Sequence, residues 1–392
     1  MPTRINDKLW NWASILEPNT RAQAELASSM PFVQPHLALM PDAHLGKGAT
    51  VGSVIPTVGA LMSAAVGVDI GCGMIAVRTQ FTRSDLTGRD SSRRDLAPLR
   101  QGIERTVPLS MGVANRDVTE TAAERIADLE ARAQRDYDEV ANRWRLQLGT
   151  LGSGNHFIEV TVDESDAVWL FLHSGSRGVG NKLATEHIAV AQRETAERGE
   201  TLPDRDLASL VEGTDAFDAY LRDLQWAQHY ALLNREEMMD RVIAELGAFL
   251  GEPVLEQERI NCHHNYTQLE VHFGQQVWLS RKGAIDASAG TPGLIPGSMG
   301  TASYVVVGRG DELSLRSSPH GAGRNFSRSK ARKTFTHAQL REAMVGIEYR
   351  DTDAFLDEIP QAYKDIDQVM ADAADLVEVR HTLRQLVNVK GD

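Results

Sequence analysis

One glycine-rich stretch, residues 66–74 (Val-Gly-Val-Asp-Ile-Gly-Cys-Gly-Met), constrains the fold more than any other part of the chain. It follows an apolar run at residues 61–66, so we expect the end of a buried strand that breaks into a turn. Its three glycines remove side chains where the backbone must bend or admit a close ligand. Between them stand Asp69 and Cys72, three residues apart. Taken alone, the stretch fits a tight turn with a buried cysteine as well as it fits a ligand site.

Several histidines occur in similar glycine-rich turns. His156 opens an expected strand after a run of glycines, and His173 ends the apolar strand expected at residues 167–172. His264 leads into another expected strand, and His320 stands among small residues. A single histidine at a strand end is more often a structural residue than a ligand. Because the arrangement recurs, the pattern favours a site that is assembled by the fold.

The side chains of these turns form a set of nitrogen, sulfur and oxygen donors: Asp69, Cys72, His156, His173 and His264. Such a mixture suits Mn, Fe, Co, Ni or Zn better than Mg or Ca. A thiolate can bridge two ions, and two metals roughly 3.5–4 Å apart are common in phosphoryl chemistry. The spacing along the chain is too wide for a zinc finger or ribbon. The alternative is a group of unrelated buried histidines.

Two further loops have the composition of anion sites. Residues 40–57 carry Asp42, His44 and Lys47 beside glycines and a short β-branched strand. The lysine and backbone amides suit an anion, but the Walker spacing is absent, so a structural loop is the favoured interpretation. Residues 295–303 offer backbone amides and hydroxyls to a phosphate or a base.

The remaining pattern predicts mainly helices. We expect a partly helical, strand-poor segment at residues 1–29 and an amphipathic helix at residues 117–145. Residues 183–250 are expected to be mainly helical, and so is the C-terminal part up to about residue 386. There is no internal repeat or clear domain boundary.

Composition sets limits on partners and location. The net charge of -13 argues against nonspecific nucleic-acid binding over the whole surface, although a local basic groove near residues 324–333 is compatible with it. Only two cysteines are present, so no disulfide framework is implied. No signal segment or membrane-spanning run is recognisable, and we expect a cytoplasmic protein without membrane association.

Seven stretches resemble the RtcB-type RNA ligases, the tRNA-splicing and RNA-repair ligases that use GTP and manganese. They occur in the family's order, at residues 41–57, 67–74, 154–159, 173–178, 261–266, 281–303 and 320–324. With residues 389–391, the resemblance covers nearly the whole chain. It implies a mixed α+β fold with central β-sheets and helices outside. We expect a single ligase domain at residues 1–392, with a mainly helical subregion at about 183–250.

The resemblance also implies roles for individual residues. Cys72 would bridge two manganese ions; Asp69 and His156 would complete one ion's protein ligands, and His173 and His264 the other's. His320 matches the nucleophile that carries GMP, and Glu159 matches the residue that reads guanine. The full set of implied nucleotide contacts is Asn155, His156, Phe157, Glu159, His264, Asn265, Pro296, Gly297, Ser298, Met299, Ser303, His320, Gly321, Ala322, Gly323 and Lys390.

The implied reaction is GTP- and Mn-dependent joining of RNA. A 3′-phosphate or 2′,3′-cyclic phosphate end is joined to a 5′-hydroxyl end through a histidine-GMP intermediate and a guanylate-capped RNA 3′ end. Two alternatives stay open: a dinuclear metal phosphohydrolase, and a non-catalytic homologue that binds nucleotide and RNA. The sequence leaves open whether tRNA halves or damaged RNA are the substrate, and whether an activating protein takes part.

Overall fold

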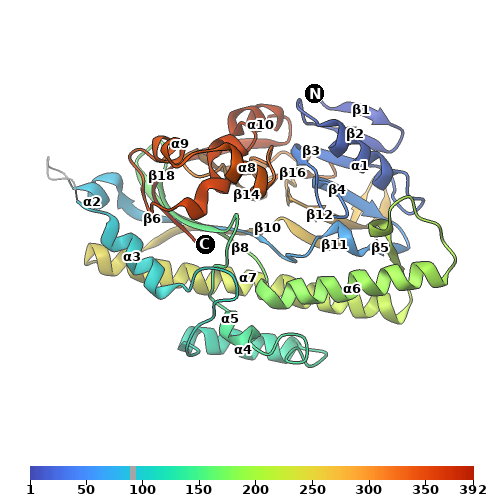
Figure 1. Ribbon diagram of the computed structural model, residues 1–392, viewed down its shortest axis with the longest axis horizontal. Coiled ribbons are helices and arrows are strands. Elements are labelled where there is room, and N and C mark those ends of the chain that lie inside the picture. Colours follow the sequence, from blue (N-terminus) through green and yellow to red (C-terminus); the bar gives the residue numbers. More distant parts are fainter. Residues whose placement is uncertain (89–93) are drawn as a thin grey trace.

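The computed structural model describes residues 1–88 and 94–392 and has the mixed α+β architecture predicted from the sequence. Figure 1 shows β-sheets at the centre, with long helices along one side of them and short helices of the C-terminal part along the other. No helix within the described ranges combines the length and the apolar character needed to cross a membrane.

The first large sheet has six strands in the order β1-β2-β3-β4-β12-β11. All neighbours are antiparallel except β2 and β3. Its strands are β1 (Thr3–Asn6), β2 (Leu9–Asn11), β3 (Leu37–His44), β4 (Val51–Thr57), β11 (Asn265–His272) and β12 (Gln275–Lys282). The N-terminal segment therefore contributes two short strands besides helix α1 (Pro18–Ser28), which corrects the strand-poor expectation.

The second large sheet has the order β10-β6-β8-β7-β18-β15-β14, with β17 paired parallel to β18. Its strands are β6 (Gly73–Thr82), β7 (Phe157–Val162), β8 (Ala167–Ser174), β10 (Glu256–His263), β14 (Pro292–Ile295), β15 (Ser303–Gly308), β17 (Glu348–Tyr349) and β18 (Val377–Lys390). The described residues also form two small ladders, β5 (Ala60–Met62) with β9 (Ser209–Val211) and β13 (Ala284–Asp286) with β16 (Ser317–Pro319).

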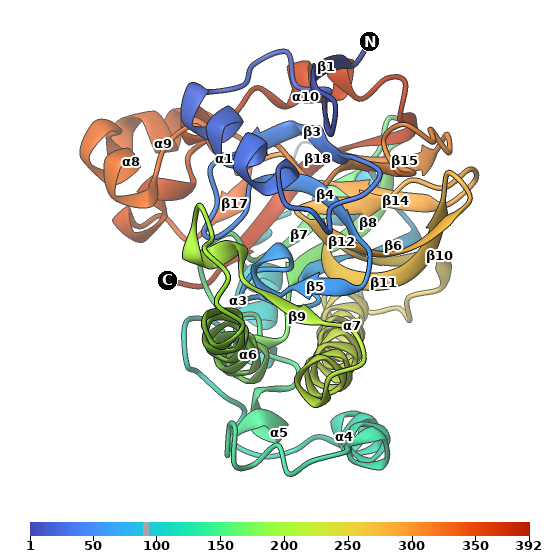
Figure 2. The same cartoon turned by 90° about the vertical axis from the view of Figure 1, so that its right-hand side faces the viewer.

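A long helix, α7 (Asp215–Leu250), crosses the molecule beside this sheet. Its first turn is capped by the Thr214 hydroxyl, which accepts from the Phe217 amide, and it ends where Gly251 adopts φ 77°. At about 1.5 Å per residue, its 36 residues reach from one end of the core to the other. The second long helix, α6 (Arg177–Glu197), lies beside it (Figure 2), and α4 (Glu120–Arg132) and α5 (Trp144–Gln147) pack outside the pair.

The remaining helices are short. They are α2 (Arg83–Thr87), α3 (Ala97–Thr106), α8 (Arg328–Thr334), α9 (His337–Ala343) and α10 (Ile366–Asp372), with 3-10 turns η1 (Ser63–Ala65), η2 (Arg205–Leu207), η3 (Asp353–Glu358) and η4 (Pro360–Ala362).

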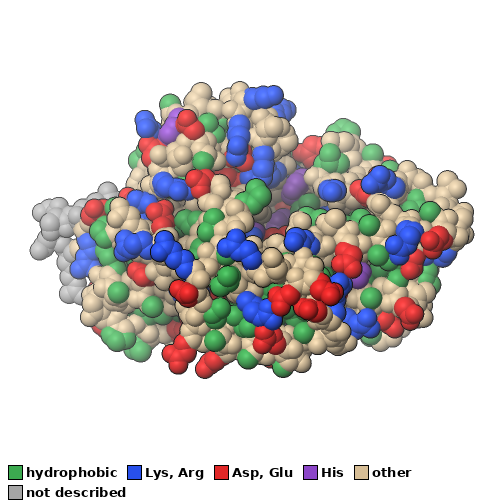
Figure 3. Space-filling view, turned by 60° about the horizontal axis from the view of Figure 1, so that its bottom comes forward, with side chains coloured by type: hydrophobic (Ala, Val, Ile, Leu, Met, Phe, Trp, Pro, Cys, Tyr) green, Lys and Arg blue, Asp and Glu red, His purple; other side chains and the backbone are tan. Residues whose placement is uncertain are grey.

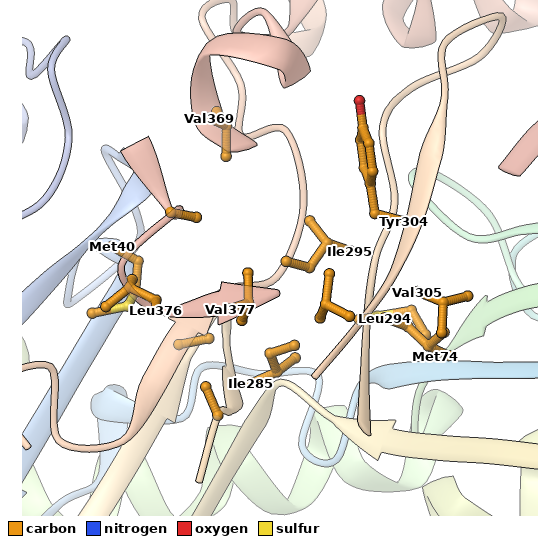
Figure 4. Close-up of a cluster of buried hydrophobic side chains, with 14 of the residues drawn as sticks. Met40, Met74, Ile285, Leu294, Ile295, Tyr304, Val305, Val369, Leu376 and Val377 are labelled. Carbon is orange, nitrogen blue, oxygen red and sulfur yellow. The ribbon is translucent and has the colours of Figure 1, made fainter. Parts of the chain in front are cut away.

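A buried apolar cluster joins the two large sheets. Figure 4 shows part of it, with Met40 of β3, Met74 of β6 and Val377 of β18 among its side chains. Burial of one such side chain contributes about 1.5–3 kcal/mol relative to leaving it exposed. The cluster therefore holds the ends of β3 and β6 in a fixed relation, and both strands lead into the candidate site.

Three further predicted elements are wrong. The C-terminal part is not helical to residue 386, because residues 377–390 form the 14-residue strand β18. Residues 61–66 are not one strand but the end of β5 and the turn η1. The expected helix at residues 117–145 consists of α4, which ends at Arg132, and the separate short helix α5.

Candidate active site

The central cavity has a volume of about 340 Å³ and collects most of the residues singled out from the sequence. Figure 3 looks onto a hollow in which histidine side chains are visible, with Lys and Arg side chains around its rim. The predicted residues that line the cavity are Asp69, Cys72, Asn155, Phe157, Glu159, His173, His264, Asn265, Pro296, Gly297, Ser298, Met299, His320, Gly321, Ala322, Gly323 and Lys390. His156 and Ser303 are buried just behind this wall.

Strand ends bring the donor residues together. Gly73 at the start of β6 pairs with Ser174 at the end of β8 and with His263 at the end of β10. Phe157 at the start of β7 pairs with His173. Only glycine fits at position 73, because a Cβ there would lie 2.1 Å from the Cys262 carbonyl oxygen. Residues next to these pairs therefore meet at one end of the sheet.

The donor atoms surround the Cys72 sulfur. His156 Nε2 lies 3.4 Å and His173 Nε2 3.3 Å from Cys72 Sγ. His264 Nε2 is 2.9 Å from His173 Nε2, and Asp69 Oδ2 is 3.1 Å from His156 Nε2. Two groups of possible metal ligands share the sulfur: Cys72 with His173 and His264, and Cys72 with Asp69 and His156.

Each of the three histidines is oriented by a contact of its other ring nitrogen. The contacts are His156 Nδ1 to Leu151 O (3.0 Å), His173 Nδ1 to Asn155 O (3.1 Å) and His264 Nδ1 to Asn265 Oδ1 (3.1 Å). For His173 and His264 these oxygens only accept hydrogen bonds, so Nδ1 carries the proton of the neutral ring and Nε2 presents a lone pair. His156 differs, because its Nδ1 also meets the Arg177 guanidinium at 3.3 Å and its Nε2 faces the Asp69 carboxylate at 3.1 Å. Histidines that ligate metals are commonly fixed in this way.

Electrostatics favour a cation at this position. Burial, followed by the charge of neighbouring histidines, lowers the pKa of His173 and His264, so both rings are neutral and their lone pairs face each other. Burial and then the Asp69 carboxylate raise the pKa of the Cys72 thiol. Although burial raises the pKa of Asp69, its contacts with His156 and Arg177 lower that pKa overall. A divalent ion would relieve the repulsion of lone pairs and stabilise the thiolate.

Helix α7 ties the site loops to each other from behind. The buried Arg235 guanidinium donates to Gly71 O at 2.8 Å and to Ser174 O at 3.2 Å. Neighbouring Asn234 accepts from Gly149 N at 2.7 Å and donates to Gly175 O at 3.1 Å. The sequence analysis missed both residues, because nothing in a helical pattern marks one polar residue as facing a distant loop.

His320 lies beside the donor cluster, with its ring centroid 4.6 Å from that of His264. Its Nδ1 is 2.6 Å from Oδ2 of Asp42, a fully buried carboxylate on β3. Because Nδ1 faces the Asp42 carboxylate at ion-pair distance, the Nε2 atom of His320 is left for chemistry. The role of Asp42 was missed, although its loop had been noted as a possible anion site.

A second group of polar side chains forms where β7 pairs with β18. Asn388 is opposite Glu159 in this pairing and donates to its Oε1 at 3.0 Å, while Lys390 is opposite Phe157. Oε2 of Glu159 and Oδ1 of Asn388 are buried without a partner among the described residues. Burial raises the pKa of Glu159 to about 8, against the opposing influence of Lys390.

The wall of this pocket continues into residues that the sequence did not single out. Glu358 Oε2 accepts from Lys390 Nζ at 2.9 Å and from the Tyr363 hydroxyl at 2.8 Å. Although burial raises the pKa of Glu358, Lys390, Arg328 and Arg324 lower it to about 2. Glu358 therefore holds these cations at the cavity, and no motif surrounds it in the sequence.

The loop at residues 295–303 lines the cavity through Pro296 to Met299. Ser303 does not reach it, because its hydroxyl accepts from Gly297 N at 3.4 Å. Ser303 thus supports the loop from behind.

The basic segment at residues 324–333 is partly neutralised. Arg328 is paired with Asp357 and Glu358, and Arg332 is paired with Asp357 at 3.1 Å. Lys330 lies over the Phe326 ring at 4.8 Å, and Lys333 is exposed. Among the residues of α8, the two lysines are therefore the better candidates for contacts with an anionic polymer.

Comparison with known proteins gives a consistent result. The family model described as tRNA-splicing ligase RtcB matches residues 23–391. The RNA-splicing ligase RtcB of Escherichia coli strain K12 is 49% identical over 401 residues, which cover 98% of this chain and 97% of that protein. The tRNA-splicing ligase RtcB of Pyrobaculum aerophilum is 31% identical over 426 residues, covering 91% of this chain and 87% of that protein.

Proposed function

The chain belongs to the RtcB family of RNA ligases, and from this membership we propose a GTP- and manganese-dependent ligase that joins 3′-phosphate or 2′,3′-cyclic phosphate RNA ends to 5′-hydroxyl ends. The observation that carries the proposal is the contact of His320 Nδ1 with the buried Asp42 carboxylate, 2.6 Å away, beside a cluster of metal donors. A cytoplasmic location is part of the proposal, supported by two free cysteines.

We assign the metal ligands to the two groups that share Cys72. Asp69 and His156 would hold one ion with the sulfur, and His173 and His264 the other. The fit is supported by the Nε2 lone pairs of His173 and His264, which face each other, and by a mixed donor set that suits Mn²⁺. When bound, the ions offset negative charge on phosphate oxygens and orient them. The protein supplies the ligand geometry and the buried surroundings.

The nucleotide would place its guanine in the pocket between β7 and β18. The unpartnered Glu159 Oε2 is an acceptor for guanine N–H groups, and Lys390 Nζ is a donor beside it. Lys390 also lies over the Phe157 ring at 5.9 Å. Gly297, Ser298 and residues 321–323 offer small side chains and backbone amides in the cavity that His320 lines.

In the first step, Nε2 of His320 attacks the α-phosphorus of GTP. A phosphorus–nitrogen bond forms, and the bond to the pyrophosphate oxygen breaks with its electron pair on pyrophosphate. Asp42 holds the ring at Nδ1 and stabilises the charge that develops on it. The RNA 3′-phosphate then takes the guanylate from His320, and the 5′-hydroxyl of the second RNA displaces GMP.

Incubation with labelled GTP and Mn²⁺ tests this function. Wild-type protein should form an acid-labile, alkali-stable guanylate adduct that maps to His320, as expected for a phosphorus–nitrogen bond. His320→Gln should form none, retain its metals and still join RNA that already carries the guanylate cap. An adduct on a lysine would contradict the assignment. End hydrolysis without a joined product would favour the phosphohydrolase, and binding without turnover the non-catalytic homologue.

A further inference from the structure

His44 is a cavity residue with no role in the ligand groups or nucleotide contacts described above. It is the last residue of β3 and lies opposite Val51 of β4. Asp42, which holds His320, precedes it by two positions on the same strand. The His44 ring is half-buried and lines the central cavity together with Lys47 and Lys282.

The proton of the His44 ring can be assigned from the one hydrogen bond that the ring makes with the described residues. Nδ1 lies 2.9 Å from the backbone oxygen of Asp42, and a carbonyl oxygen only accepts. Nδ1 therefore carries the proton, and Nε2 presents a lone pair. No hydrogen bond from another described residue satisfies that lone pair.

The surroundings keep this ring neutral. Burial lowers the pKa of His44 to about 4, and the charges of His320 and Lys364 act in the same direction against the Asp42 contact. A neutral imidazole is a proton acceptor. Anionic phosphates that enter the cavity would favour the protonated ring and so make it a stronger base.

The neighbouring wall has the chemistry of a phosphate site. Lys282 Nζ donates to Ala64 O at 3.0 Å and to Lys47 O, and in its protonated form one of its three N–H donors is left for a ligand. Burial lowers the pKa of Lys282 to about 7, and a bound phosphate would favour the protonated form. Lys47 lines the same cavity, and its backbone oxygen is the one that accepts from Lys282 Nζ. His44 lines the same cavity as both lysines, so a chain end held by its phosphate at the lysines has its terminal group in the cavity that His44 faces.

We propose that His44 Nε2 accepts the proton of the RNA 5′-hydroxyl in the joining step, which makes it a further catalytic residue. The inference rests on the proposed function, because it requires a guanylate-capped 3′ end. The 5′-oxygen forms a bond to the phosphorus of the 3′-phosphate, the bond from that phosphorus to the GMP oxygen breaks, and GMP leaves with the electron pair. The hydroxyl proton moves to His44 Nε2.

The test separates joining from guanylation. His44→Asn retains an N–H near the Nδ1 position for the Asp42 carbonyl and removes the Nε2 lone pair. It should join pre-capped RNA to 5′-hydroxyl RNA about 100-fold more slowly than wild type, which is the effect typical of losing a general base. The His320 adduct should still form within about threefold of the wild-type rate, a change far smaller than that effect. The control is His381→Asn, whose ring contacts Glu164 and does not line the cavity. Added imidazole should partly restore joining in His44→Ala.

Each outcome decides between roles. Joining at the wild-type rate by His44→Asn, or no rescue of His44→Ala by imidazole, would overturn the proton-acceptor role. Equal losses of guanylation and joining would also overturn it, because His44 would then act through Asp42 and His320. If the wild-type protein fails to join pre-capped RNA, the proposed function is overturned as well. If the wild-type protein joins it, a negative result with the His44 variants overturns only the role of His44.

Discussion

The Asp42 carboxylate and the His320 imidazole meet at 2.6 Å, between Oδ2 and Nδ1, although the two residues are far apart in the sequence. Asp42 has no solvent exposure. Strand β3, which pairs with β4, carries Asp42, and the turn at residues 317–324 packs closely against β3. The packing is so close that a Cβ on Gly323 would lie 2.3 Å from the Asp42 carbonyl oxygen. Orientation of the ring is thus a property of the fold.

The first prediction tests this contact. Asp42→Asn keeps the size of the side chain but removes the negative charge beside Nδ1. We expect guanylation of His320 to slow roughly 100-fold, because a misdirected Nε2 attacks poorly. Metal content should stay at the wild-type level. Single-turnover adduct formation measures the effect, with the exposed Asp375→Asn as control. A wild-type rate would show that Asp42 does not position the nucleophile.

The second prediction concerns the shared sulfur. Cys72→Ala removes a ligand from both proposed ions, whereas His264→Ala removes one from a single ion. We expect the larger loss of bound Mn²⁺ in Cys72→Ala, together with loss of ligation. Elemental analysis of dialysed protein measures stoichiometry. Cys262→Ala, which alters the other free cysteine, should bind metal normally. Full metal content in Cys72→Ala would refute the bridge.

The third prediction concerns pH and the guanine pocket. Burial raises the pKa of Glu159 to about 8, so the empty pocket holds a protonated carboxyl at neutral pH. Guanine N–H donors favour the ionised form, so GTP binding should release a proton. Affinity should therefore rise with pH up to about 8, by at most tenfold per unit. Calorimetry in buffers of different ionisation enthalpy measures the proton. Glu159→Gln should bind more weakly and lose this pH dependence; an unchanged slope in that variant would place the titrating group elsewhere.

The fourth prediction concerns support of the site from α7. Arg235 is fully buried and donates to Gly71 O and Ser174 O. Arg235→Lys cannot reproduce these bonds, and loss of partners for a buried group costs about 1–3 kcal/mol. We expect a lower Tm and weaker Mn²⁺ binding, with Tm partly restored at high Mn²⁺. Arg222→Lys, at an exposed position of the same helix, should change neither. A wild-type Mn²⁺ affinity in Arg235→Lys would contradict the proposed support.

The fifth prediction refines the location of the RNA groove. Because Arg328 and Arg332 are paired with acidic residues, Lys330 and Lys333 are the better candidates for phosphate contacts. The double change to Gln should lower the slope of log K against log salt by about 0.7 for each contact with a single strand. Binding isotherms at several salt concentrations measure it. An unchanged slope would place the groove away from α8.

The sequence alone determined which side chains are available for chemistry. Glycine turns around Cys72, His173 and His320 predicted a site assembled at strand ends. A turn of this kind is a local feature, so a few neighbouring residues are enough to recognise it. Strands β7 and β8 were predicted for the same reason, as short apolar runs bounded by turns. The roles of the individual residues stay proposals.

Only the tertiary structure decided which partners those side chains meet. Strand β18 was mistaken for helix because its charged residues mask the alternation, and its pairing with β7 is what brings Lys390 beside Phe157. Asp42, Arg235 and Glu358 carry no local signal, because each is defined by a contact with a residue far away in the chain. Long-range contacts of this kind depend on how sheets and helices pack, and packing is a property of the whole chain.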